Sequence, residues 1–121
     1  MPGPMLSEHF SVAEFACRHC GKLPPRGISK ALLANLEKAR ARHFPTGLRI
    51  ASGYRCPQHR LSQASPNSRH VKGDAADIPP VMTVQQAKAC GFRGIGFNAR
   101  GLVVHVDMRL FPAKFPDLGT A

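Results

Sequence analysis

One stretch of the chain, residues 28–43, carries apolar residues at helical spacing. These apolar positions are Ile28, Leu32, Leu36 and Ala39. Ser29 stands near the start, where a hydroxyl can cap the first turn, and Pro45 follows, which cannot continue a helix. The spacing therefore predicts a helix over residues 28–43.

A second stretch, residues 102–109 (LVVHVDMR), changes to a period of two. The alternation places on one face Leu102, Val104, Val106 and Met108. It places on the opposite face Val103, His105, Asp107 and Arg109. This pattern predicts a strand with one face on the core and the other mostly polar.

Two shorter elements lie between these stretches. Residues 48–54 (LRIASGY) predict a short strand that runs into a turn at Gly53, and residues 83–90 predict a second short helix closed by Gly91. Residues 56–77 have the Pro, Asn, Ser and Gly content of a loop, yet they hold two histidines and two aspartates. Loops on a rigid scaffold often carry chemistry, so this segment is a candidate site.

Length and composition predict one globular domain over residues 1–121, with irregular ends at residues 1–8 and 111–121. Hydrophobic residues make up 43% and charged residues 20% of the chain. No apolar run approaches the roughly 18 residues of a membrane span, so no membrane partner is expected. The net charge of +10 favours attraction to nucleic acid, anionic lipid or a bacterial wall, and charge alone does not choose among them.

The N-terminal residues, MPGPMLSEHF, contain no basic segment followed by an apolar core. We therefore expect cytoplasmic synthesis without a secretory signal. The four cysteines are then expected to be reduced, which points to metal or core positions rather than a disulfide scaffold.

Three potential metal ligands stand out in the second half of the chain. His70 and Asp77 are seven positions apart, a spacing that on one helix would separate them by roughly 10 Å. To share an ion they need the chain to fold back between them, and Gly73 allows this. His105 offers a third ligand, and two histidines with one carboxylate form a common catalytic zinc set with an open position for water. The alternative is that these are ordinary surface or core side chains.

Five segments carry a resemblance to a known family. They are HFSVAEFACRHCG (9–21), SGYRCPQH (52–59), SRHVKGDAADI (68–78), GFRGIGFN (91–98) and VVHVDMR (103–109). In this order they resemble the zinc D-alanyl-D-alanine carboxypeptidase superfamily of bacterial and phage cell-wall peptidases, to which the hedgehog signalling domain is related. The combination of SxHxxGxAxD with a later strand carrying HxD is specific, and the segments span most of the chain.

The resemblance implies roles for five residues. His70, Asp77 and His105 fall on the family's three zinc ligands, so the implied cofactor is Zn²⁺. Arg55 falls on the arginine that contacts the substrate carbonyl or carboxylate, a role that suits a guanidinium beside a developing oxyanion. An ordinary salt bridge is the alternative for Arg55. Ser68 falls on a serine that helps to hold substrate, and a turn-capping hydroxyl is its alternative.

The general base is the least determined part of the site. HExxH is absent, and Leu102 occupies the position three residues before the last ligand where some members carry an acid. Asp107 shares the polar strand face with His105, and Asp74 lies inside the turn before Asp77. We favour Asp107, either as the base or as the carboxylate that orients a ligand histidine.

The cysteines raise a second metal hypothesis. Cys17 and Cys20 form a CxxC pair, and Cys56 and His59 form a CxxH pair. Together they could hold a structural zinc that ties the N-terminal segment to the SGYR loop and stiffens it. The alternative is that Cys17 and Cys20 are small buried residues and that His59 faces solvent. Cys90, at a helix end, is expected to be core only.

The sequence is compatible with three function classes. The leading one is a monomeric zinc metallopeptidase that cuts peptidoglycan peptides containing D-amino acids, as a carboxypeptidase or an endopeptidase. The second is a cell-wall-binding module that keeps zinc but has lost hydrolysis. The third, a nucleic-acid-binding zinc finger, leaves the histidines and Asp77 unexplained, and the chain has one Tyr and no Trp for base stacking. No nucleic-acid partner is therefore expected.

The expected fold is α+β: a small, mostly antiparallel sheet with two helices over its apolar face and a zinc cleft on its polar face. Without a signal peptide, such an enzyme would reach the wall through a holin, lysis or a specialised exporter. This route is typical of a phage or prophage endolysin.

Overall fold

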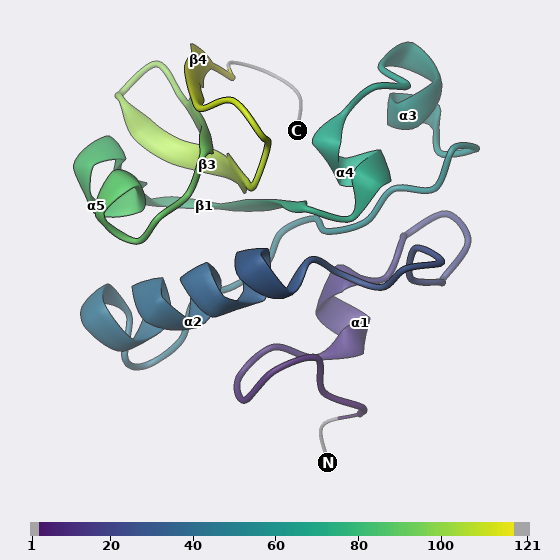
Figure 1. Ribbon diagram of the computed structural model, residues 1–121, viewed down its shortest axis with the longest axis horizontal. Coiled ribbons are helices and arrows are strands. Elements are labelled where there is room, and N and C mark those ends of the chain that lie inside the picture. The colour runs from purple at the N-terminus through teal and green to yellow at the C-terminus, as the bar shows by residue number, and fades with distance from the viewer. Residues whose placement is uncertain (1–2, 118–121) are drawn as a thin grey trace.

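The computed structural model describes residues 3–117, which form one four-stranded sheet with short helices around it (Figure 1). The helices are α1 (Val12–Phe15), α2 (Lys30–His43), α3 (Arg60–Ala64), α4 (Arg69–Lys72) and α5 (Val84–Ala89). The strands are β1 (Ala75–Thr83), β2 (Gly94–Phe97), β3 (Leu102–Asp107) and β4 (Ala113–Pro116). This is an α+β arrangement, as predicted. The prediction of one domain over residues 1–121 remains a prediction, and residues 1–2 and 118–121 lie outside the described part.

The sheet is mixed, which corrects the prediction of a mostly antiparallel one. Its strand order is β1-β3-β2-β4, and β3 is antiparallel to both of its neighbours, whereas β4 runs parallel to β2. The parallel edge strand comes from residues 113–116, a segment expected to be irregular. Its short sequence, AKFP, has no clear period, so the pairing with β2 determines its conformation.

The helix predicted over residues 28–43 is confirmed as α2. Ser29 caps it by accepting a hydrogen bond from the Leu32 amide at 3.2 Å, and Ile28 lies before the first turn. α2 lies along one side of the sheet (Figure 1), and its buried residues are Leu32, Leu33, Leu36 and Ala39. The second predicted helix is α5, whose cap Thr83 forms a capping box with Gln86.

A bulge in β3 corrects the simple alternation predicted for residues 102–109. In the pairing with β2, Val103 lies opposite Phe97 and His105 lies opposite Gly96, so Val104 is an extra residue. One inserted residue reverses which side chains face the core on one side of it. Val103 is therefore fully buried, although the alternation placed it on the polar face, while His105 keeps its predicted face.

Residues 48–54 do not form the predicted strand. They make one isolated bridge, Ser52 to Asp77, and the Tyr54 amide then turns to the carbonyl of Phe15 at 2.8 Å. The segment is thus held between β1 and α1 instead of joining the sheet. Gly53 is needed for this close approach, because a Cβ there would lie 2.7 Å from the Phe15 Cα.

The core fills the space between α2 and the sheet. Its fully buried side chains include Leu32, Leu36, Met82, Val103 and Val106. Cys90 belongs to this core, as expected. Within residues 3–117, no helix has both the length and the apolar character to cross a membrane.

Candidate active site

A short helix and a tight turn bring His70 back to the sheet. The Ser68 hydroxyl caps α4 by accepting from the His70 amide at 3.3 Å. Gly73 ends the helix with a left-handed φ of 80°, and a Cβ there would lie 2.8 Å from the Pro24 ring. The chain then enters β1, which carries Asp77, so the predicted fold-back at Gly73 is confirmed.

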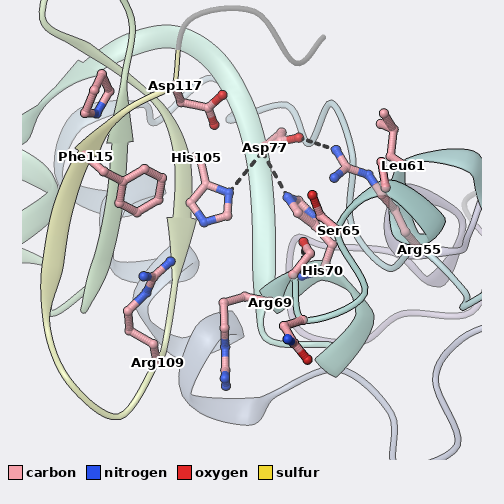
Figure 2. Close-up of a pocket in the computed structure, with 14 residues that line it drawn as sticks. Arg55, Leu61, Ser65, Arg69, His70, Asp77, His105, Arg109, Phe115 and Asp117 are labelled. Atoms are coloured by element: carbon pink, nitrogen blue, oxygen red, sulfur yellow. Dashed lines mark hydrogen bonds and ion pairs between the residues drawn. The ribbon is translucent and has the colours of Figure 1, made fainter.

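The structure brings His70, Asp77 and His105 together (Figure 2). Asp77 and His105 are cross-strand partners in the β1–β3 ladder, and His70 arrives from α4. The Asp77 Oδ1 atom lies 3.1 Å from His70 Nε2 and 3.2 Å from His105 Nδ1. One potential ligand atom from each residue lies within 4.8 Å of the others, as a shared ion requires.

The second nitrogen of each ring is held by an acceptor. His70 Nδ1 lies 2.7 Å from the Gly53 carbonyl oxygen, and His105 Nε2 lies 2.7 Å from Asp107 Oδ2. A carbonyl or carboxylate oxygen can only accept, so both of these ring nitrogens carry the proton. In the neutral rings, the remaining lone pairs therefore face Asp77. Metal-binding histidines are typically oriented in this way.

The converging lone pairs need a cation between them. In the absence of metal, a proton on His105 fills this role: burial lowers the pKa of His105, but Asp107 and Asp77 outweigh burial and raise it to about 9. Burial alone would raise the pKa of Asp77, but its contacts with the two histidines hold that pKa well below its ordinary value. Two imidazole nitrogens and a carboxylate are a donor set that fits Zn²⁺.

Asp107 lies behind His105 and is fully buried. Besides His105, its carboxylate accepts from the Arg109 amide at 3.0 Å and from the Arg109 guanidinium, at 2.6 Å for Nη2. It is not among the described residues that line the pocket. Gly94 makes room for it, because a Cβ at position 94 would lie 2.0 Å from Asp107 Oδ1. This placement suits a carboxylate that orients His105.

Arg55 reaches the same cluster from the SGYR segment. Its Nη2 atom donates to Asp77 Oδ2 at 2.7 Å, and the side chain also lines the pocket. The salt bridge considered as an alternative is therefore present, and it holds a predicted metal ligand. Ser68 likewise caps α4 and lines the pocket, so its two interpretations are compatible.

A pocket of about 450 Å³ opens beside the cluster. Several of its lining residues were not given a role by sequence reasoning, among them Arg109, Phe115 and Asp117. The Phe115 ring lies 5.5 Å from the His105 ring, and the Arg109 guanidinium carbon lies 4.9 Å from the Phe115 centroid. Arg109 could have been found from its position on the polar strand face. Phe115 and Asp117 belong to no helical or strand-like sequence pattern that would have identified them as pocket residues.

The cysteine cluster is also assembled in part. The sulfur atoms of Cys17, Cys20 and Cys56 lie within 4.8 Å of one another. His59, the predicted fourth ligand, lies outside this group. Its Nδ1 instead accepts from the Leu61 amide at 3.1 Å and caps α3.

Comparison with known proteins adds one decisive observation. The family model described as Peptidase M15 matches residues 8–107. This chain belongs to the peptidase M15 family. That family is the zinc D-alanyl-D-alanine carboxypeptidase-like group, whose members depend on zinc, so the resemblance seen in the sequence is confirmed. Searches of curated proteins and of solved structures found no match. In this M15 peptidase the family match ends at Asp107, so the pocket wall formed by Arg109, Phe115 and Asp117 lies beyond it.

Proposed function

We propose that this M15 peptidase is a zinc metallopeptidase that hydrolyses peptidoglycan peptides, as a D-Ala-D-Ala carboxypeptidase or a cell-wall endopeptidase. The observation that carries the proposal is the orientation of the two ring lone pairs toward Asp77. Each imidazole is fixed by its own acceptor, Gly53 for His70 and Asp107 for His105. Such a preorganised donor set beside a pocket is what a catalytic metal site needs.

His70, Asp77 and His105 would hold the ion. When bound there, Zn²⁺ supplies Lewis acidity, which polarises a peptide carbonyl and makes water more acidic. Asp77 offers Oδ1 toward the two rings, while its Oδ2 accepts from Arg55. The ligand carboxylate is therefore fixed by a cation on its other oxygen.

Arg55 has a second role in this proposal. Because it lines the pocket, its guanidinium can donate to the oxygen of a peptide carbonyl as negative charge develops there. Ser68 lies on the same wall, and its hydroxyl hydrogen can be donated to substrate while its oxygen accepts from the His70 amide.

Asp117 is the proton acceptor in this proposal. Asp77 and Asp117 are the two carboxylates among the described residues that line the pocket, and Asp77 is a proposed zinc ligand. Asp117 lies near His105 at the pocket wall (Figure 2): a Cβ at Gly96 would lie 3.0 Å from the His105 Cβ and 3.1 Å from the Asp117 Cβ. Asp107, fully buried and bonded to Arg109, is assigned to orienting His105.

The charges around the pocket support the proposed substrate class. Arg55, Arg69 and Arg109 all line it, and each is oriented by a carboxylate of Asp77, Asp74 or Asp107. Guanidinium groups suit peptides that carry carboxylates, as peptidoglycan stem peptides do. The net charge of +10 also favours approach to an anionic wall.

The deciding experiment is digestion of purified sacculi and of D-Ala-D-Ala peptides, with the products identified by mass spectrometry. We expect cleavage that stops with a chelator, returns with zinc and is absent in His70→Ala. A zinc-loaded protein that cuts no wall peptide would overturn the proposal and favour the binding module.

A further inference from the structure

A second group of metal-type ligands lies away from the pocket. Cys17 and Cys20 lie in the turn after α1, and Cys56 follows Arg55 in the SGYRC segment. Their three sulfur atoms lie within 4.8 Å of one another although 39 positions separate Cys17 from Cys56. A disulfide needs two thiols, so three converging thiols point to a different use.

The backbone around Cys17 prepares it to act as a thiolate. The amides of Cys56 and His19 both point at its sulfur, at 3.2 and 3.4 Å. Amide hydrogens that point at a sulfur favour its negatively charged form. Thiolate, not thiol, is the form that binds metal.

The turn between Cys17 and Cys20 keeps the sulfur atoms of these two residues close together. The Gly21 amide donates to the Cys17 carbonyl at 2.7 Å, and Gly21 has a left-handed φ of 74°. Cys17 and Cys56 are buried, whereas Cys20 is exposed. An ion can therefore reach the sulfurs from the Cys20 side.

From this geometry we infer that Cys17, Cys20 and Cys56 bind a second zinc ion, which is structural. Zn²⁺ prefers four ligands, and thiolates with one imidazole are a common structural set. His59 is the fourth ligand in this inference, because its amide donates to the Cys56 carbonyl at 3.0 Å and so keeps it one turn from that cysteine. To bind the ion, its ring must leave the Leu61 amide that it now caps.

The position of this ion would connect the N-terminal segment to the catalytic cluster. Three consecutive residues of the segment before Cys56 have partners elsewhere: Gly53 holds His70, Tyr54 holds Phe15, and Arg55 holds Asp77. A zinc that joins Cys56 to the turn after α1 would fix this segment from its other end. Zinc binding at the cysteines itself does not depend on the proposed function.

The first test is the zinc content of purified full-length chain. We expect two ions per chain in the wild type, one in Cys20→Ser and one in a His70→Ala/His105→Ala variant. Cys20 is exposed, so its substitution is the mildest of the three, and Cys90→Ala, a buried cysteine outside the group, is the matched control with two ions. Equal zinc content in Cys20→Ser and wild type would overturn the inference, whatever the activity.

The second test replaces zinc with Co²⁺, whose thiolate complexes have a strong sulfur-to-metal absorption band. We expect this band in the wild type and in His70→Ala/His105→Ala, and its loss in Cys20→Ser. Absence of the band in a cobalt-loaded wild type would overturn the inference.

A third test concerns the fourth ligand. Zinc competition with a coloured chelator should show at least a tenfold weaker site in His59→Ala but not in His19→Ala. Unchanged affinity in His59→Ala would remove His59 from the site.

Discussion

The two clusters of metal-type ligands are built in different ways. Asp77 and His105 stand on paired strands, each histidine of that cluster has its own acceptor, and a pocket opens beside them. The cysteines instead stand on turns and on an irregular segment, and backbone amides point at Cys17. Secondary structure and hydrogen-bonded partners fix the first cluster, whereas the proposed zinc would join the separate segments of the second. This difference is the basis for proposing a catalytic role for the first cluster and a structural role for the second.

Removing the ion from the first cluster should have the largest effect. His70→Ala or His105→Ala should lower kcat/KM at least about a thousandfold, because Lewis-acid stabilisation of a transition state is worth several kcal/mol. Steady-state hydrolysis of a wall peptide measures this loss, and circular dichroism checks that the variant is folded. Activity within tenfold of wild type would contradict the assignment of the first cluster as catalytic.

The next prediction distinguishes the role of Asp117 from that of Asp107, the two carboxylates near His105. Asp117→Asn should lower kcat about 10²- to 10⁴-fold with little change in zinc content, because it removes the proposed proton acceptor. Leu110→Ala, an exposed change outside the pocket-lining set, is the control. A kcat within twofold of wild type in zinc-loaded Asp117→Asn would return the base role to Asp107.

Asp107→Ala should act through metal affinity. Loss of the carboxylate that orients a ligand histidine typically costs about 10- to 100-fold in metal affinity or activity. Zinc competition measures the affinity, and activity at saturating zinc should recover in part. Full zinc affinity in Asp107→Ala would mean that the acceptor on His105 is dispensable.

The cysteine cluster should influence stability more than chemistry. Cys20→Ser should lower the melting temperature by about 5 °C or more, because an ion that binds only the folded state stabilises it. Its kcat should fall only about two- to fivefold, through looser positioning of Arg55. Differential scanning fluorimetry with and without added zinc measures the first effect. A loss of activity as large as that of His70→Ala would blur the distinction between the clusters.

The smallest expected effect concerns the metal-free protein. A folded-state pKa of about 9 for His105, above the usual 6.5, contributes stability that is present below about pH 6.5 and is lost as pH rises through 9. Chelator-treated protein should therefore become less stable between pH 7 and 10, while zinc-loaded protein should lose less. Urea unfolding at several pH values tests this, and parallel curves for both forms would contradict it.

Local patterns identified the parts of the fold that depend on local interactions. The Ser29 cap and the spacing of Leu32 and Leu36 predicted α2, and Gly73 predicted the fold-back that brings His70 to Asp77. Arg55 was identified through the family resemblance, which implied a substrate contact; it lines the pocket and also forms the salt bridge that was its alternative.

The features that were missed depend on long-range pairing. The bulge at Val104 is visible only in the register between β3 and β2. Residues 113–116 form the strand β4 because they pair with the edge of β2. Residues 48–54 have strand-like composition, but Phe15 competes with β1 for their hydrogen bonds. The placement of Asp117 depends on β4, which is why no sequence pattern marked it.

The absence of a side chain at Gly94 makes room for the Asp107 carboxylate, so the residues at these two positions depend on each other. With the Asp107 carboxylate 2.0 Å from where a Cβ would stand, even alanine at position 94 would displace the group that holds His105. A lineage that acquires a side chain at position 94 must therefore change residue 107 or its surroundings at the same time. Among natural variants of this chain, we expect substitution at one of these two positions to accompany substitution at the other.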